Sequence, residues 1–201
     1  MSSMLGNVGI ASDSFEVARR PLEAGLCALV VVDIQEKLLP PIFNKEQMVK
    51  NSQLLIRLAK ILDIPVMATT QYCKGLGQTV PEIASLLGDV ATYDKLEFSC
   101  FGSDAFRAKL KSLPGSRNTV LLCGMEAHIC VMQTALGALG DGYLVHVASD
   151  AVGSRAEWNW KIGLERIKAA GAVISSTEMM MYELLRCSGT AEFKEMLKYL
   201  K

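Results

Sequence analysis

The stretch TVLLCGMEAHICVMQTAL, residues 119–136, joins a strand pattern directly to a helix pattern. Residues 120–123 form a continuous apolar run of strand length. From Ala127 onwards, apolar residues recur at spacings of three and four, which is typical of a helix. Gly124, Met125 and Glu126 lie between the two patterns. The stretch therefore predicts a strand that leads through a tight turn into a helix.

Cys130 lies just after this turn, in or near the first turn of the predicted helix. There its sulfur would be close to the positive end of the helix dipole and to unpaired backbone N–H groups. This setting favours the thiolate, which is the nucleophilic form of cysteine. A cysteine within an apolar run is more often a small core residue, so its position alone does not establish catalysis.

The composition of the 201 residues is typical of one domain with an aliphatic core. Half of the residues are hydrophobic, 21% are charged, 6% are aromatic, and the formal net charge is zero. A balanced charge argues against nucleic-acid and membrane-surface partners, and no apolar run approaches the roughly 20 residues of a membrane span. The six cysteines form no C-x-x-C pair, which favours a reducing, cytoplasmic compartment over a disulfide framework.

Residues 1–23 are small, polar and irregular, and we interpret them as an N-terminal arm before a single domain at 24–201. Arg19 and Arg20 close this arm, but it also contains acids, which transit peptides usually lack. A mitochondrial location is therefore the alternative to a cytoplasmic one.

Six apolar segments have the length and pattern of buried strands, and helical patterns separate most of them. The predicted strands cover residues 27–33, 64–69, 90–93, 119–123, 143–148 and 172–174. One predicted helix follows Asn44, others cover 81–87, 103–110, 127–139, 157–170 and 175–185, and a last one begins near Thr190. Asn44, Ser103 and Ser175 are the predicted N-terminal caps of three of these helices. This alternation predicts βαβ units and a three-layer α-β-α fold with a six-stranded parallel sheet.

Three chemically active residues follow strands of the predicted sheet. Asp33 ends the first strand, Lys95 follows the third, and Cys130 follows the fourth. Each has an ordinary alternative role, as a helix cap, a solvated lysine or a core cysteine. Parallel sheets bind ligands at the carboxyl ends of their strands, so the three side chains are expected to meet there. Together they supply the proton acceptor, cation and nucleophile of a covalent hydrolase.

The mechanism that these residues predict begins when Asp33 takes the Cys130 proton and the thiolate attacks a carbonyl carbon. Lys95 holds the Asp33 carboxylate and favours the thiolate. Backbone N–H groups of Glu126 and Cys130 would stabilise the oxyanion, each by about 3–4 kcal/mol. Asp33 then protonates the leaving amine and deprotonates the water that hydrolyses the thioester. The scheme uses no metal or cofactor, and its substrate is a small amide-like molecule.

The chain carries five motifs in order: VVDIQEK at 31–37, QY at 71–72 with KGLG at 74–77, DKLEFSC at 94–100, GMEAHICV at 124–131 and SDAVGSR at 149–155. In this order they resemble the isochorismatase-like cysteine hydrolase superfamily, and most closely the isochorismatase domain-containing proteins. The resemblance implies a sheet of six parallel strands and a catalytic triad of Asp33, Lys95 and Cys130. It also implies a cis peptide bond between Met125 and Glu126 and a homo-oligomer.

Two departures from the relatives narrow the implied activity. Isochorismatases usually have glycine where this chain has Cys130, which favours thiol chemistry over vinyl-ether hydrolysis. Nicotinamidases carry an Asp/His/His metal site in the region that matches residues 71–78, and this segment has no histidine. The resemblance therefore implies a cysteine hydrolase without settling its substrate.

Gln35, Tyr72, Phe98 and His128 are candidate pocket residues, although each could equally pack the surrounding loops. His128 lies two residues before Cys130, a spacing that does not bring side chains together on a helix, so a packing role is favoured.

Two other classes of function stay open. One is a non-catalytic, oligomeric binding or scaffold protein that retains the three residues. The other is a nuclease, an activity attributed to some relatives, against which the zero net charge and the lack of a carboxylate-rich metal cluster both argue.

Overall fold

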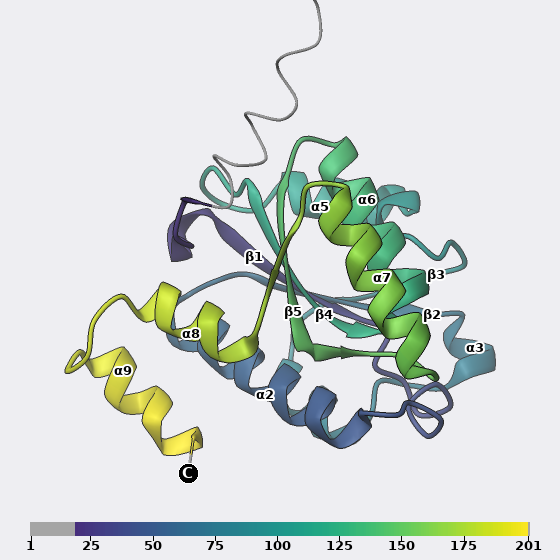
Figure 1. Cartoon of the computed structure of the whole chain (residues 1–201), viewed down its shortest axis with the longest axis horizontal. Helices are drawn as coiled ribbons and strands as arrows, with labels where there is room; N and C mark the ends of the chain where they lie inside the picture. Colours follow the sequence, from purple (N-terminus) through teal and green to yellow (C-terminus); the bar gives the residue numbers. More distant parts are fainter. Residues whose placement is uncertain (1–18, 201) are drawn as a thin grey trace, which may run out of the picture.

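The computed structural model describes residues 19–200, so most of the arm predicted at 1–23 lies outside the described residues. One parallel sheet of six strands runs through the centre, in the order β3-β2-β1-β4-β5-β6, between two layers of helices (Figure 1). The strands are β1 (Cys27–Val32), β2 (Val66–Gln71), β3 (Thr92–Lys95), β4 (Thr119–Met125), β5 (Leu144–Gly153) and β6 (Val173–Ser175). The predicted three-layer fold with six parallel strands is confirmed.

Helices α2 and α8 cover one face of the sheet, with α9 packed against α2, and α5, α6 and α7 cover the other face (Figure 1). The longer helices are α2 (Lys45–Ile61), α5 (Asp104–Lys111), α6 (Met132–Gly140), α7 (Glu157–Ala169) and α8 (Thr177–Leu185). The shorter ones are α3 (Cys73–Leu76), α4 (Pro81–Leu87) and α9 (Ala191–Met196). No helix within residues 19–200 is long and apolar enough to cross a membrane.

Strand β1 shows why a continuous apolar run forms a central strand. All six of its residues are buried, and successive side chains point to opposite faces. Leu29 and Val31 pack into the hydrophobic core beneath α2 and α8, whereas Val30 and Val32 pack into the core beneath α6 and α7. A strand that is buried on both faces needs apolar residues at every position, which is the pattern of residues 27–32.

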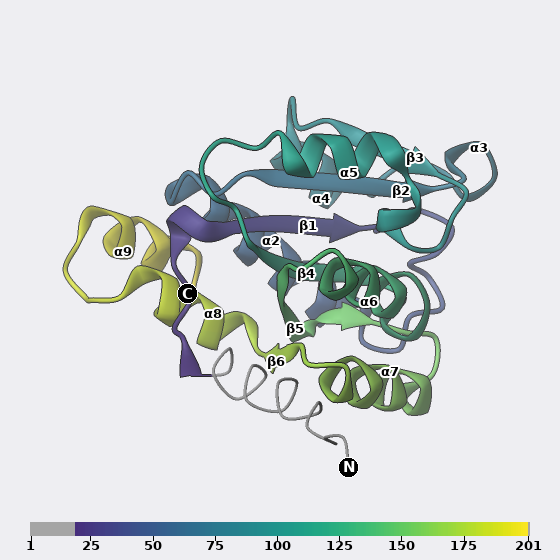
Figure 2. The same ribbon diagram turned by 90° about the horizontal axis from the view of Figure 1, so that it is seen from above.

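The strand order reverses between β1 and β4, which lie side by side at the middle of the sheet. Crossovers that leave neighbouring strands in opposite directions open a crevice at their carboxyl ends. Figure 2 shows β1 and β2 side by side, with their arrowheads at the edge where α3 lies. We call this edge, where the parallel strands end, the carboxyl edge.

Several element boundaries differ from the sequence predictions. The third strand, predicted at 90–93, begins at Thr92 and includes Asp94 and Lys95, which pair with β2. Because β3 is the edge strand, its exposed positions accept polar residues that a central strand would exclude. The fifth strand extends to Gly153 because a bulge in its pairing with β4 is followed by further paired residues.

Two predicted helix caps are wrong and one is confirmed. Asn44 makes no capping bond, since its side-chain amide donates to the Val152 carbonyl oxygen instead. Helix α8 is capped by Ser176, whose hydroxyl accepts the Met179 N–H, and not by Ser175. The Ser103 hydroxyl caps α5 as the sequence predicts, and the Thr190 hydroxyl caps α9.

Candidate active site

Asp33 directly follows β1 at the carboxyl edge and is fully buried. Its backbone is left-handed, with φ of 49°, so the chain turns sharply as the strand ends. The Thr69 hydroxyl donates to Asp33 Oδ1 at 2.7 Å, and the Lys95 ammonium donates to Oδ2 at 2.7 Å. Both side chains of the Lys95–Asp33 ion pair have zero exposed area, so each charge depends on the other for compensation.

Gln71 fixes the other side of the Lys95 ammonium, which donates to Gln71 Oε1 at 2.7 Å. Thr69 and Gln71 are two residues apart on β2, so their side chains project from the same face. The Gln71 backbone is held in turn by Gln35, which accepts its N–H at 2.7 Å and donates to its carbonyl oxygen at 3.1 Å. Gln35 is therefore a buried support beneath the ion pair.

Gly124 allows β4 to approach β1 closely just before the turn. Its φ is 118°, and an added Cβ would lie 2.0 Å from the Val32 carbonyl oxygen, a separation that no side chain can tolerate. The next peptide bond but one, between Met125 and Glu126, is cis, as the resemblance implied. The turn therefore begins at a position that requires glycine.

Cys130 lies in a π-helical turn, Ala127–Val131, which leads directly into α6, so it is near the first turn of the α-helix as the sequence predicts. The Ile129 and Val131 N–H groups both donate to the Glu126 carbonyl oxygen, at 3.0 and 3.2 Å. Helix α6 starts only at Met132. Cys130 is 6% exposed, so its sulfur is buried with access from one side.

The electrostatic environment of Cys130 opposes ionisation of its thiol. Burial raises the pKa of Cys130 most, and the negative charge of Asp33 raises it further, against a smaller lowering by Lys95. The prediction that the helix dipole favours the thiolate is therefore wrong for the free protein, because desolvation and the negative charge of Asp33 outweigh the dipole. Cys130 is a thiol with a proton acceptor beside it.

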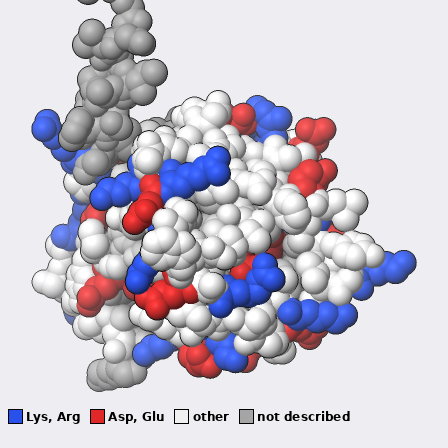
Figure 3. All heavy atoms as spheres, turned by 45° about the vertical axis from the view of Figure 1, so that its right-hand side comes forward, with Lys and Arg blue, Asp and Glu red and all other residues white. Residues whose placement is uncertain are grey.

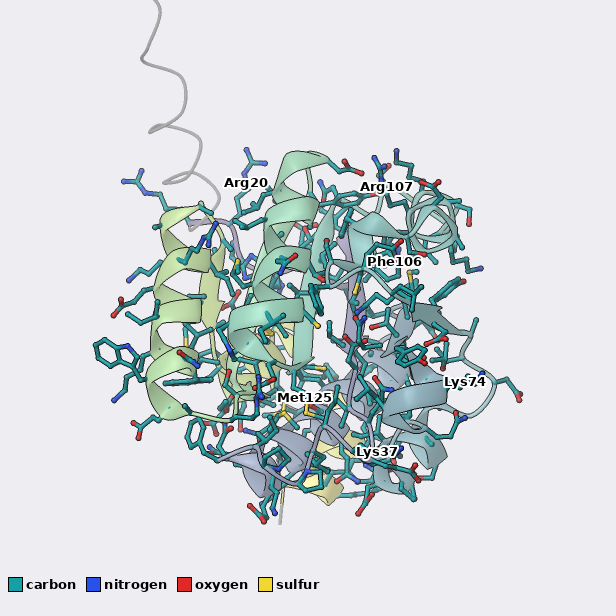
Figure 4. All side chains as sticks on the ribbon, turned by 90° about the vertical axis from the view of Figure 1, so that its right-hand side faces the viewer. Arg20, Lys37, Lys74, Phe106, Arg107 and Met125 are labelled. Atoms are coloured by element: carbon teal, nitrogen blue, oxygen red, sulfur yellow. The ribbon has the colours of Figure 1, made fainter. Side chains whose placement is uncertain are left out.

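A cavity of about 380 Å³ opens at the carboxyl edge next to Cys130, and we call it the Cys130 cavity. Its walls are mainly apolar, formed by Leu38, Pro41, Leu76, Phe98 and Ile129. Its polar lining residues are Lys37, Gln71, Glu126 and Arg155. Figure 4 faces this edge, with Lys37 on the loop after β1, Lys74 on α3 and Met125 nearer the centre. The Cys130 thiol is thus reachable from a small-molecule-sized space.

Of the four candidate pocket residues, only one lines the Cys130 cavity. Phe98 lines the Cys130 cavity, whereas Gln35 lies buried behind it. Tyr72 is 48% exposed and is not among the lining residues. His128 also lies outside the lining, with its ring Nδ1 3.0 Å from the Ser154 hydroxyl oxygen.

Gln71 and Arg155 lie in the motifs quoted from the sequence, but sequence reasoning did not assign either residue to the site. Gln71 lay outside the strand predicted at 64–69, although alternation with Thr69 would have placed both on one face. Arg155 forms an ion pair with Glu126, with Nε 3.0 Å from Oε1, and its backbone N–H donates to Oε2 at 2.9 Å. The loop after β5 is therefore tied to Glu126, the residue just before the π-helical turn that carries Cys130.

Gly163→Ala in α7 is expected to destabilise the protein by about 1–3 kcal/mol, because the site lacks room for a methyl group. An added Cβ would lie 2.8 Å from the His128 Cα and 3.0 Å from the His128 backbone N. The matched control is Gly140→Ala at the end of α6, where an added Cβ meets nothing within 4 Å. Urea denaturation measures both, and equal midpoints for the two variants would contradict the prediction.

All six cysteines lie in the described part of the chain and are free thiols. Within residues 19–200, no three His, Cys, Asp or Glu side chains form a group that could hold a metal ion.

Comparison with known proteins identifies relatives along most of the chain. The family model "Isochorismatase domain" matches residues 27–179. The secreted isochorismatase effector Isc1 of Phytophthora sojae (strain P6497) is 40% identical over 176 residues, covering 86% of this chain and 83% of that protein. Isochorismatase domain-containing protein 2 of Rattus norvegicus is 37% identical over 173 residues, covering 86% and 80%. The structure of the MAR1 ribonuclease from Caenorhabditis elegans matches with a TM-score of 0.84 at 35% identity, covering 90% of this chain and 92% of that one.

Proposed function

The chain belongs to the isochorismatase family, and from this premise we propose that it hydrolyses an amide-like C–N bond of a small molecule through a Cys130 thioester. The observation that carries the proposal is that Cys130 lines a cavity whose lining residue Gln71 accepts a hydrogen bond from Lys95, the ammonium that holds the buried Asp33 carboxylate at 2.7 Å. A nucleophile, its proton acceptor and a fixed cation are the parts that covalent hydrolysis requires.

Asp33 acts as a general base in this proposal, because burial and the Asp33 charge raise the pKa of Cys130 and so favour the protonated thiol. As the sulfur attacks the carbonyl carbon, its proton passes to the Asp33 carboxylate, and Lys95 keeps that carboxylate in place. The backbone N–H groups of Glu126 and Cys130 are proposed to bind the oxyanion. Collapse of the tetrahedral intermediate breaks the C–N bond, and the amine leaves with the proton from Asp33.

The second half of the reaction returns the enzyme to its starting state. Asp33 deprotonates a water molecule, which attacks the thioester carbonyl and breaks the C–S bond. The sulfur leaves as a thiolate and regains its proton from Asp33. One water is consumed, and the products are a carboxylic acid and an amine, or ammonia when the substrate is a primary amide.

Ammonia release from a panel of small primary amides tests the proposal. The wild-type protein is expected to release ammonia from at least one amide, and Cys130→Ala is expected to release none above the uncatalysed rate. Cys100→Ala is the matched control, because Cys100 is also a buried thiol but lines no part of the Cys130 cavity. Undiminished ammonia release by Cys130→Ala would contradict the thioester route. Inactivity of the wild type on every amide would favour the non-catalytic binding protein.

RNA cleavage is a second candidate because one relative, at 35% identity, is described as a ribonuclease. Figure 3 argues against a long RNA substrate, since Lys and Arg side chains on that face are interspersed with Asp and Glu. The decisive test incubates a labelled RNA oligonucleotide with the wild type and with Cys130→Ala. Cleavage that disappears with the Cys130 sulfur would place nuclease chemistry at this site, and cleavage that persists would indicate a contaminant.

Self-association and a cytoplasmic location remain predictions for this chain. One relative is named a secreted effector, which is a statement about that protein.

A further inference from the structure

The polar groups that line the Cys130 cavity do not balance in charge. Lys37 and Arg155 are cations, and Glu126 is the one carboxylate among the lining residues. Arg155 and Glu126 form an ion pair with each other at 3.0 Å, so their charges cancel. Lys95 and Asp33 cancel likewise beneath the cavity. Lys37 is therefore the source of one uncompensated positive charge at the cavity.

The Lys37 ammonium has free hydrogen-bonding capacity. It donates to the Gly75 carbonyl oxygen at 2.9 Å, which uses one of its three N–H groups. Within residues 19–200, no carboxylate lies within ion-pair distance of this ammonium. An ammonium with two unused donors, next to an apolar cavity, can bind an anion that enters from solvent.

The backbone that carries Lys37 is well fixed. The Lys37 N–H donates to the Leu76 carbonyl oxygen at 3.2 Å, and the neighbouring Glu36 N–H donates to the Gln78 carbonyl oxygen at 3.0 Å. Gln35 forms a bridge with Thr79 on the same segment. Lys37 lies only four residues after Asp33, so one short loop carries the proposed base and the free cation.

We infer that the substrate is a compact amide whose apolar body carries a carboxylate at its far end, and that Lys37 binds this carboxylate. The inference rests on the proposed function and specifies its substrate class. The cavity volume of about 380 Å³ lies at the small end of small-molecule sites, which excludes bulky substrates. The walls formed by Leu38, Leu76 and Phe98 accept the apolar body, and the carboxylate end remains at the mouth with Lys37.

The test compares two amides that differ only at the far end, adipamic acid and hexanamide. The affinity of Cys130→Ala, which cannot form the thioester, is measured for each amide by ligand-observed NMR titration at low salt. The acid is expected to bind at least fivefold more tightly, because its carboxylate can form an ion pair with Lys37. The preference stays modest because Lys37 is exposed and solvent partly screens the pair. Adding Lys37→Met to Cys130→Ala is expected to remove the preference, and 0.5 M NaCl is expected to weaken it.

Lys74→Met is the matched control, because Lys74 is an exposed lysine on the adjacent α3 that does not line the cavity. In the Cys130→Ala background it is expected to keep the preference for the acid, as is Lys37→Arg. Equal affinities for the two amides, failure of the acid to bind, or a preference that survives Lys37→Met would each overturn the inference. Ammonia release by the wild type is scored separately, so loss of the proposed chemistry is distinguishable from loss of this specificity.

Discussion

Asp33→Asn is expected to lower amide hydrolysis by roughly 10⁴-fold while making Cys130 more reactive towards iodoacetamide at pH 7. Hydrolysis falls because asparagine cannot accept the thiol proton. Alkylation rises because the negative charge of Asp33 raises the pKa of Cys130, and its removal leaves Lys95 facing the sulfur. The two rates are therefore expected to move in opposite directions in a single variant.

The direction of the pH dependence follows from the raised pKa of Cys130. In the wild type, the thiol stays protonated through the neutral range, so alkylation is expected to increase steadily to pH 9 without a plateau. Each unit by which Asp33→Asn lowers this pKa increases the thiolate fraction tenfold. Intrinsic nucleophilicity falls at the same time, so the alkylation rate rises by about threefold per unit.

Mass spectrometry after timed alkylation from pH 6 to pH 9 follows each cysteine separately. Cys187 is exposed and serves as the internal reference. Asp94→Asn is the matched control. Asp94, on β3, is also a carboxylate, but it accepts hydrogen bonds from the Thr70 hydroxyl and the Cys73 N–H. Slower alkylation of Cys130 in Asp33→Asn than in the wild type would show that the carboxylate does not hold the thiol proton.

The elements that the sequence predicts best are those whose burial requires one kind of side chain. Residues 27–32 are apolar at every position because β1 is covered on both faces, so a run of six residues identifies the strand. The turn at Met125 and Glu126 is also predicted from the sequence, because it follows Gly124, where close contact with Val32 requires glycine. Such features can be predicted from the local sequence because each of them accepts only one kind of side chain.

The parts of the site that the sequence could not provide depend on contacts between distant segments. The sequence identifies Lys95 as a candidate, but a lysine after a strand is usually solvated. Only the pairing of Lys95 with Gln71 on β2 shows that it is buried. The raised pKa of Cys130 likewise follows from its burial and from the negative charge of Asp33, neither of which appears in a local sequence pattern. A helix-dipole argument describes one local field, and tertiary burial can outweigh it.

Lys95→Met is expected to lower the free energy of unfolding by about 3–5 kcal/mol, because it leaves the buried Asp33 carboxylate without its cation. Methionine retains much of the length of lysine, so the loss reflects charge more than volume. Asp33 would keep the Thr69 hydroxyl at 2.7 Å, but a single neutral donor does not compensate a fully buried charge. Urea denaturation, with the slope compared to the wild type, measures the change.

Lys161→Met provides the control, since Lys161 and Glu157 form an exposed ion pair at 2.8 Å on α7. Its loss is expected to cost no more than about 0.5 kcal/mol. The double variant Asp33→Asn with Lys95→Met removes both buried charges, so it is expected to be more stable than Lys95→Met alone. If Lys95→Met costs no more than Lys161→Met, or if the two buried substitutions simply add, the ion pair does not hold the carboxyl edge together. Recovery in the double variant would instead show that the instability comes from the stranded Asp33 charge, the same charge that is proposed to accept the Cys130 proton.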